Sequence, residues 1–127
     1  MEGIIVGDYL PPELTKKNFE NNIPTVMIDS KKINKYFPTI YADNIDGTMT
    51  LVDHLAAKGH QKIAFIAGNK HRSFRERYQG YLLGLQKHNL EYNPDYVILD
   101  NTPTGSIAQG TNLMKKLLQL EIKPTAV

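Results

Sequence analysis

Residues 54–68 read HLAAKGHQKIAFIAG, and this stretch decides the fold class. Its first half continues a helical apolar face whose members are Met49, Val52, Leu55 and Ala56. Gly59 stands where a helix ends in a left-handed cap, and we expect His60 beside it to cap the last helix carbonyls. The apolar run that follows predicts a strand over 62–67, ended by Gly68. A helix, a glycine cap and a strand in this order are typical of an α/β fold.

The same alternation runs through the rest of the chain. Short apolar runs predict buried strands at 4–6 and 24–29, and further strands at 39–42, at 96–99 and from 124 onward. Helices are predicted over 11–21, from 44 to the glycine cap, over 74–85 and over 106–120. Residues 30–38 are polar and carry no helical stripe. Strands separated by helices predict parallel sheets built from βαβ units.

The composition is that of an ordinary globular chain. It has 127 residues, 41% hydrophobic and 22% charged, and this length predicts one domain with a real core. With 15 Lys and Arg against 13 Asp and Glu, the net charge of +2 is too balanced for nucleic-acid binding over the whole surface. The absence of cysteine excludes disulfides, thiol nucleophiles and thiolate metal sites. No apolar run could span a membrane, and the acid after Met1 predicts no secretory signal.

Asp or Asn stands at the carboxyl end of most predicted strands. Open α/β sheets bind ligands beyond these ends, where converging carboxylates and amides could accept hydrogen bonds from ligand hydroxyls. The alternative for each of them is a helix cap or a turn, which the same residues favour. The residues concerned are Asp8, Asp29, Asp43, Asn44, Asn69, Asp100 and Asn101.

A basic stretch occupies residues 69–77, with four cations and one acid. It has two interpretations: a solvated loop, or a helix start from which one arginine points into a crevice. A guanidinium suits the second task because its planar fork gives paired hydrogen bonds to a hydroxylated or anionic ligand. Cations oppose the dipole at a helix N-terminus, so their presence favours a functional reason.

Enzyme signatures are missing from the sequence. It lacks the nucleophile elbow, the phosphate loop, the dinucleotide fingerprint and the zinc-protease motif. Residues 43–47 are similar to a calcium loop only loosely, with the wrong spacing, and are better interpreted as a helix start. We therefore expect no catalytic residue, no cofactor and no metal site.

The stretch at 54–68 resembles the H-L-x-x-x-G-H-x-x-I-A-x-x-x-G block of the LacI/GalR family of bacterial transcriptional repressors. Its flanks agree with that family in the same order. Residues 2–6 look like the D-G-I-I-V strand, and residues 23–29 look like the P-V-V-x-I-D strand. The remaining matches are Asp43-Asn44 with Gly47 for D-N-x-x-G, 77–81 for R-x-x-G-[YF], and 123–127 for the R/K-P-T-A strand.

The resemblance implies an effector-binding core with the type I periplasmic-binding-protein fold. That fold has two doubly wound parallel-sheet subdomains that flank a cleft, and we expect only part of each in this chain. Residues 1–43 would belong to the N-terminal subdomain and residues 44–127 to the C-terminal one. The helix-turn-helix, the hinge helix and the first two βα units of the core would lie outside the chain.

Five effector-binding residues are carried over from the family pattern. Arg77 matches the cleft arginine that hydrogen-bonds the effector, and Ser73 matches a position one turn earlier that lines the pocket. Asp29 matches an acidic cleft residue of the other subdomain, and Asp8 follows a strand that also borders the cleft. Asn101 falls near where many members carry an aromatic that packs on the ligand, so the usual stacking contact is replaced here.

The implied function is a cytoplasmic regulatory module, neither an enzyme nor a membrane protein. A sugar or sugar derivative would close the two subdomains and change the DNA affinity of a homodimer, through a helix-turn-helix domain absent from this chain. One alternative is a periplasmic sugar-binding protein of the same fold. A flavodoxin-like enzyme is the other, which the missing phosphate loop disfavours.

Overall fold

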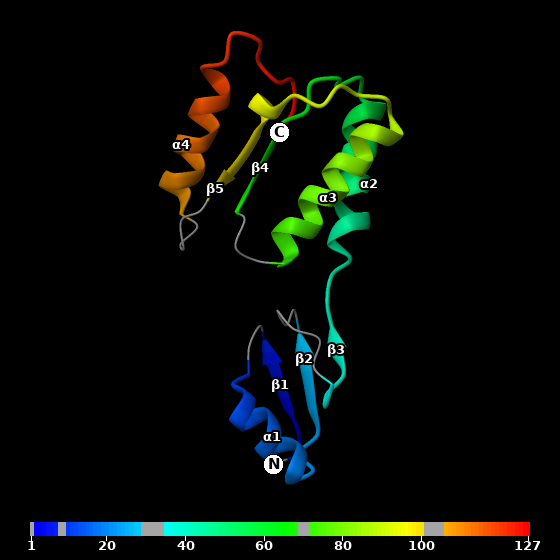
Figure 1. Ribbon diagram of the computed structural model, residues 1–127, viewed down its shortest axis with the longest axis vertical. Helices are drawn as coiled ribbons and strands as arrows, with labels where there is room; N and C mark the ends of the chain where they lie inside the picture. Colours follow the sequence, from blue (N-terminus) through cyan, green and yellow to red (C-terminus); the bar gives the residue numbers. More distant parts are fainter. Residues whose placement is uncertain (1, 8–9, 29–34, 69–71, 101–105) are drawn as a thin grey trace. The chain divides into compact units, whose positions relative to one another are not determined.

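The chain divides into two compact units, Met1–Ala42 and Asp43–Val127, each with its own parallel sheet (Figure 1). The computed structural model describes residues 2–7, 10–28, 35–68, 72–100 and 106–127. Both units combine helices with parallel strands, so the predicted α/β class is confirmed.

The first unit is a three-stranded parallel sheet with one helix. Its strands lie in the order β1 (Ile4–Gly7), β2 (Thr25–Ile28), β3 (Thr39–Ile40). The helix α1 (Pro12–Glu20) joins β1 to β2 and begins with proline at its first turn, where no backbone donor is lost. Its core holds Met27, Phe37 and the Thr15 side chain, whose hydroxyl donates to the Pro11 carbonyl at 3.0 Å.

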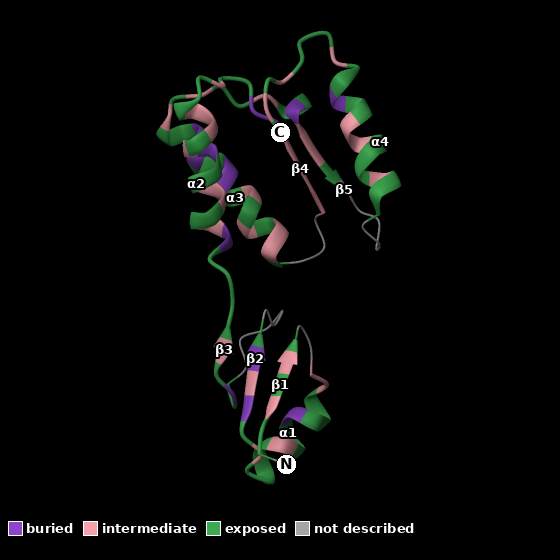
Figure 2. Cartoon of the chain, turned by 180° about the vertical axis from the view of Figure 1, so that it is seen from behind, coloured by how far each residue is buried: buried purple, intermediate pink, exposed green. Residues whose placement is uncertain are grey.

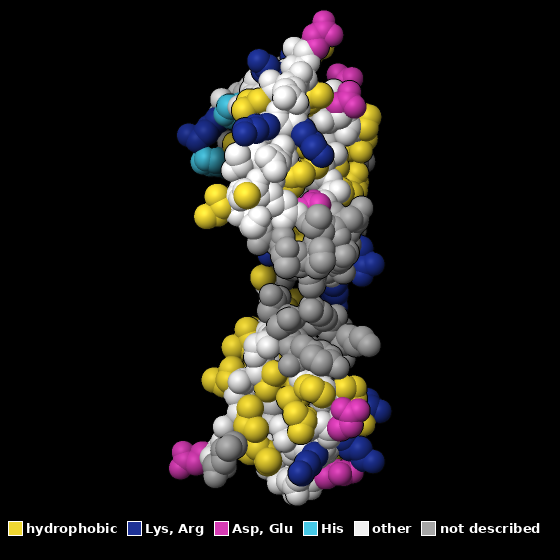
Figure 3. All heavy atoms as spheres, turned by 90° about the vertical axis from the view of Figure 1, so that its left-hand side faces the viewer, with side chains coloured by type: hydrophobic (Ala, Val, Ile, Leu, Met, Phe, Trp, Pro, Cys, Tyr) yellow, Lys and Arg dark blue, Asp and Glu magenta, His cyan; other side chains and the backbone are white. Residues whose placement is uncertain are grey.

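One face of this sheet is open within the described residues. Ile5 is 75% exposed and Ile40 is 62% exposed, so the prediction of a buried first strand is wrong for this structure. The physical reason is that β-strand side chains alternate between two faces, and α1 can cover only one of them. Hydrophobic side chains gather on the surface of this unit in Figure 3. The third strand is also shorter than predicted: it ends at Ile40, and Tyr41 and Ala42 lie outside it.

The second unit contains three helices and a two-stranded parallel sheet. Its elements are α2 (Asn44–Ala57), β4 (Phe65–Gly68), α3 (Arg72–Lys87), a short 3₁₀ helix (Pro94–Tyr96), β5 (Val97–Asp100) and α4 (Ile107–Leu118). The strand predicted from 124 onward is reduced to one parallel bridge, between Ala126 and Ile63.

The sheet of the second unit separates two cores. Ile63 belongs to a cluster with Val52, Tyr81 and Leu85 from α2 and α3. The next residue, Ala64, belongs to a second cluster, which contains Tyr96 and Leu117. Successive strand residues point to opposite faces, so α2 and α3 cover one face and α4 covers the other (Figures 1 and 2). The parallel sheet agrees with the alternation of elements, and helices on both of its faces agree with the doubly wound subdomain that the resemblance implies.

The end of α2 is capped by backbone donors. Gly59 has a φ of +87°, as a left-handed cap requires, and its N–H donates to the Ala56 carbonyl at 2.9 Å. The expectation that His60 caps a carbonyl at the helix end is confirmed, because its backbone N–H donates to the Leu55 carbonyl at 3.1 Å. The His60 ring lies elsewhere, with its Nδ1 3.2 Å from the Thr125 hydroxyl.

Two glycines of α3 let it pack closely against α2. A Cβ at Gly80 would lie 2.4 Å from the Ile45 carbonyl oxygen, and one at Gly84 would lie 2.7 Å from the Val52 Cβ. Tyr81, the residue after Gly80, is fully buried, and its hydroxyl donates to the Ile63 carbonyl at 2.9 Å. Burial raises the pKa of this phenol to about 12. The two glycines therefore allow α3 to pack against α2, and the Tyr81 hydroxyl ties α3 to the sheet.

We expect Gly80→Ala to lower the free energy of unfolding by about 1–3 kcal/mol, because the new methyl group meets helix backbone that cannot rotate away. The matched control is Gly47→Ala in α2, where a Cβ meets nothing within 4 Å. This control should stabilise by about 0.5–1 kcal/mol, as alanine does in a helix. Urea denaturation measures both, and equal effects of the two substitutions would contradict the close approach.

An ion-pair cluster on the solvent side also joins α2 to the end of α3. Asp53 accepts hydrogen bonds from Lys87 Nζ and from His88 Nε2, each at 2.7 Å. These bonds, that of Lys87 above all, hold the pKa of Asp53 below its ordinary value of 3.8. Because the pKa is depressed in the folded state, the stabilisation is present above the ordinary value and is lost as pH falls through the folded one.

Asp53→Asn should therefore lower the melting temperature at neutral pH, and its difference from the parent should shrink as pH falls below 3.8. Thermal unfolding followed by circular dichroism at several pH values measures this. The control is Glu91→Gln, which removes an exposed acid outside this cluster. A difference between Asp53→Asn and the parent that stays constant down to about pH 2 would refute the linkage.

Candidate functional site

The carboxyl ends of β4 and β5 form one edge of the second sheet. Gly68 and Asp100 are paired in register there, at the last positions of their strands. The start of α3 lies against this edge, since a Cβ at Gly68 would meet the Phe74 ring at 2.6 Å. Ligands of parallel α/β sheets bind at such an edge, so the first turns of α3 are the place to look for a site.

Two of the predicted effector-binding residues stand on these first turns. Ser73 and Arg77 are four residues apart in α3, a spacing that puts both on one side of the helix. Ser73 is half-buried, and the Arg77 side chain is exposed with its guanidinium 5.9 Å from the centre of the Phe74 ring. The structure thus brings these two predicted residues together.

A chain of polar contacts links Arg77 to α2. Arg77 Nε donates to Asn44 Oδ1 at 2.9 Å, and Asn44 Nδ2 donates to Glu76 Oε2 at 3.0 Å. The other Glu76 oxygen pairs with Arg72 Nε, one helical turn earlier. Asp43, just before Asn44, caps α2 by accepting from the Asp46 N–H at 3.0 Å. We call Arg72, Glu76, Asn44 and Arg77 the polar relay.

The relay keeps Glu76 ionised. The hydrogen bond from Arg72 is the main cause that lowers the pKa of Glu76, and the bond from Asn44 lowers it further against the opposing effect of burial. A carboxylate therefore stands between two arginines at the start of α3. It offsets the repulsion between these cations and the positive end of the helix dipole.

The other three predicted site residues lie outside the described residues. They are Asp8, Asp29 and Asn101. Their assignment to an effector site stays a prediction. Of the five predicted site residues, the structure describes Ser73 and Arg77.

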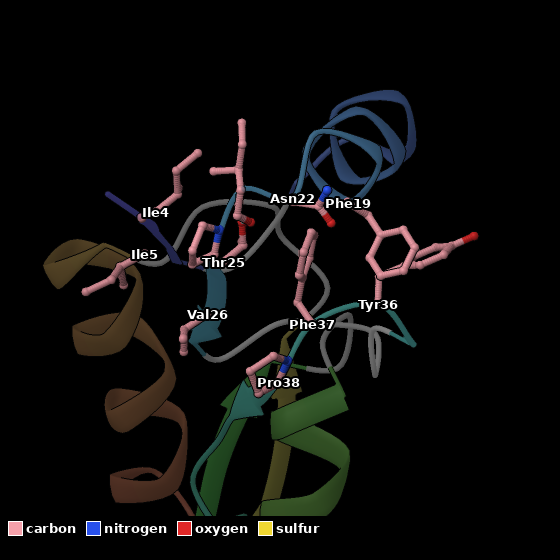
Figure 4. A pocket seen from close by; sticks show the side chains of 12 residues that line it. Ile4, Ile5, Phe19, Asn22, Thr25, Val26, Tyr36, Phe37 and Pro38 are labelled. Carbon is pink, nitrogen blue, oxygen red and sulfur yellow. The ribbon is translucent and has the colours of Figure 1, made fainter. Parts of the chain in front are cut away.

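Two pockets in the described part of the chain lie away from the strand carboxyl ends. One, of about 700 Å³, is lined by Ile4, Phe19, Thr25 and Phe37, at the amino ends of β1 and β2 (Figure 4). The other, of about 500 Å³, is lined by Lys62 and Tyr96 among others, two residues that precede β4 and β5 in the chain. The first is lined by apolar and uncharged polar side chains, and the second mostly by residues that precede β4 and β5 in the chain, so neither lies at the carboxyl ends of the strands.

Among the described residues, no group of three or more His, Cys, Asp or Glu side chains could hold a metal ion. Within the same residues, no helix is long and apolar enough to cross a membrane.

Glu76 and the bridging role of Asn44 were missed from the sequence. The i, i+4 spacing of Arg72 and Glu76 in the basic stretch is a signal that predicts their pairing. No local signal connects Asn44 with Glu76, because 32 positions separate them. Asn44 was weighed only as a strand-end residue and a helix start.

Comparison with known proteins gives one family match. The model of the periplasmic binding protein-like domain matches residues 52–127, more than half of the chain. The repressor CytR of Escherichia coli (strain K12), an HTH-type transcriptional repressor, is 28% identical over 125 residues, which are 98% of this chain and 36% of that protein. The chain thus spans about a third of the length of this curated relative.

Solved structures agree with this match. A regulatory protein of the LacI family from Chloroflexus aggregans is similar with a TM-score of 0.77 and 26% identity, over 98% of this chain and 45% of that one. A LacI-family regulator from Lactobacillus casei with bound sucrose shares the fold, with a TM-score of 0.71 and 19% identity over 98% of this chain and 46% of its own. The chain therefore belongs to the family of periplasmic binding protein-like domains, in the form that LacI/GalR transcriptional regulators carry.

Proposed function

We propose that this chain is part of the effector-sensing core of a transcriptional regulator, and that Arg77 and Ser73 contact the effector. The observation that carries the proposal is the placement of the Arg77 guanidinium at the carboxyl edge of β4 and β5. Its Nε donates to Asn44, and its two Nη groups make no hydrogen bond or ion pair with the described residues. Such a pair of donors suits a ligand that offers two neighbouring oxygens.

The proposed effector is a small hydroxylated molecule, with a sugar as the first candidate. A guanidinium beside an aromatic ring supplies both of the contacts that a sugar ring uses, donors for its hydroxyls and an apolar face for its C–H groups. The related Lactobacillus casei regulator, solved with sucrose, supports the same class. Asp8, Asp29 and Asn101 are proposed as further polar contacts.

In this proposal the two units, Met1–Ala42 and Asp43–Val127, are parts of the N-terminal and C-terminal effector-binding subdomains. Effector binding closes the subdomains, because the closed state offers contacts from both and so binds the effector more tightly. The closure changes the affinity of a cytoplasmic homodimer for DNA, which a helix-turn-helix domain outside this chain contacts. Effector and DNA are then coupled reciprocally. The proposed role requires no catalysis.

A thermal-shift screen tests the effector class directly. The full-length protein is heated with glucose, sucrose, ribose, adenine and guanine, and a ligand that binds the native state raises the melting temperature in a concentration-dependent way. We expect a sugar to give the largest rise. A rise with a nucleobase alone would replace the sugar by a planar ligand, and no rise with any of the five would count against the proposal.

Arg77→Ala should weaken binding of the best compound by about a hundredfold, because paired hydrogen bonds to a charged donor are lost. Its free energy of unfolding should change by less than about 1 kcal/mol, since the side chain is exposed. Isothermal calorimetry and urea denaturation measure the two quantities. Arg75→Ala, an exposed arginine of the same helix, is the matched control and should leave the affinity unchanged. Unaltered affinity of the Arg77 variant would overturn the proposed site.

A further inference from the structure

We propose that Asn44 is a positioning residue for Arg77, which holds the guanidinium in the orientation that the effector meets. This inference rests on the proposed function of Arg77. It concerns a different residue from a different helix, and Asn44 itself need not touch the ligand.

The contacts of Asn44 determine how its amide is turned. Its Oδ1 lies 2.9 Å from Arg77 Nε, and its Nδ2 lies 3.0 Å from Glu76 Oε2. Only this orientation places the amide oxygen on a donor and the amide nitrogen on a carboxylate, since the reverse would face donor to donor and acceptor to acceptor. Glu76 is in turn held by Arg72. The Glu76 carboxylate therefore fixes the orientation of the Asn44 amide, and the amide oxygen in turn orients Arg77.

A bond at Nε constrains a guanidinium more than a bond at either Nη. The Cδ–Nε and Nε–H bonds both lie in the guanidinium plane, so a hydrogen bond at Nε restricts rotation about Cδ–Nε and thereby the plane in which both Nη groups donate. The Phe74 ring, 5.9 Å from the guanidinium carbon, lies next to the same group. A long side chain that is already ordered loses less freedom when a ligand binds, so the constraint should raise affinity.

The Asn44 side chain is not needed to begin α2. Asp43 already caps the helix through its bond with the Asp46 N–H at 3.0 Å. Asparagine is also a poor helix former, because its side chain competes for backbone hydrogen bonds. Yet Asn44 is only 9% exposed, so its amide is largely withdrawn from water and directed into the relay. Because asparagine is unfavourable in a helix, its presence at this buried position is better explained by its hydrogen bonds to Glu76 and Arg77.

The first experiment compares two asparagine-to-alanine variants. Asn44→Ala should weaken binding of the best compound from the five-compound screen by about tenfold, because Arg77 must then be ordered by the ligand. Asn93→Ala is the control, because the Asn93 side chain also makes a hydrogen bond, accepting from the Asp95 N–H at 2.9 Å, but lies before β5 at the opposite edge of the sheet. It should leave the affinity unchanged. Equal losses in the two variants would overturn the inference.

A second readout needs no ligand. In a ¹⁵N-labelled protein, the Arg77 Nε–H signal, assigned by its loss in Arg77→Lys, should exchange slowly with water and should move and exchange faster in Asn44→Ala. An Arg77 signal that is the same in the parent and in Asn44→Ala would overturn the inference even if no compound bound.

A charge-preserving exchange tests the direction of the relay. Asn44→Asp alone places two carboxylates together and should weaken ligand binding. Adding Glu76→Gln lets the new amide N–H donate to the carboxylate at position 44, which still accepts from Arg77 Nε. The two changes of charge cancel, so the net charge is that of the parent. The double variant should recover most of the lost affinity. A double variant as weak as Asn44→Asp would contradict the relay.

The two proposals fail in different ways. If Arg77→Ala leaves affinity unchanged, the effector site is wrong whatever Asn44 does to the Nε–H signal. If Arg77→Ala abolishes binding and Asn44→Ala has no effect on affinity, the site stands and only the positioning role is refuted.

Discussion

The close approach of α2 and α3 at Gly80 is the constraint on which the rest of the second unit depends. A side chain at this position would reach the Ile45 carbonyl oxygen at 2.4 Å, so only glycine allows the two helices to pack at this distance. Ile45 follows Asn44, and Gly80 lies one turn after Glu76. The contact between backbones therefore brings the first turn of α2 within hydrogen-bonding reach of the first turns of α3, where the polar relay forms.

The same helix pair is tied to the sheet through one buried phenol. Tyr81 follows Gly80, points away from solvent and bonds the Ile63 carbonyl at 2.9 Å. Because Ile63 and Ala64 face opposite sides of the sheet, one short segment connects the core under α2 and α3 to the core under α4. Arg77 therefore stands on a helix that a buried hydrogen bond ties to the sheet. A side chain on such a helix is held in place more firmly than one on a loop.

Local patterns were enough to predict most of the elements, whereas Arg77 was singled out by the family resemblance and its role in a site stays a prediction. Apolar spacing and the Gly59 cap are properties of neighbouring residues, so the helices and the parallel strands followed from them. The exposure of Ile5 depends on distant segments, and the prediction of a buried first strand was wrong. The contact of the His60 ring with Thr125 also joins distant positions, and no local pattern predicts it. Asn44 and Glu76 meet across 32 positions, a contact that no periodicity encodes.

In the proposed site, the charges at the start of α3 would serve effector binding. Arg72 is the first residue of the helix, where a cation faces the positive dipole end at a cost of about 0.3–1 kcal/mol, whereas Arg77 lies beyond the first turn, where this effect has fallen off. Glu76 offsets part of this cost through Arg72, while Arg77 reaches the same carboxylate only through the Asn44 amide. The hydrogen bond that Arg77 makes within this group is to a neutral amide, so no carboxylate offsets its positive charge there. In the proposed site, this charge is available to an external ligand.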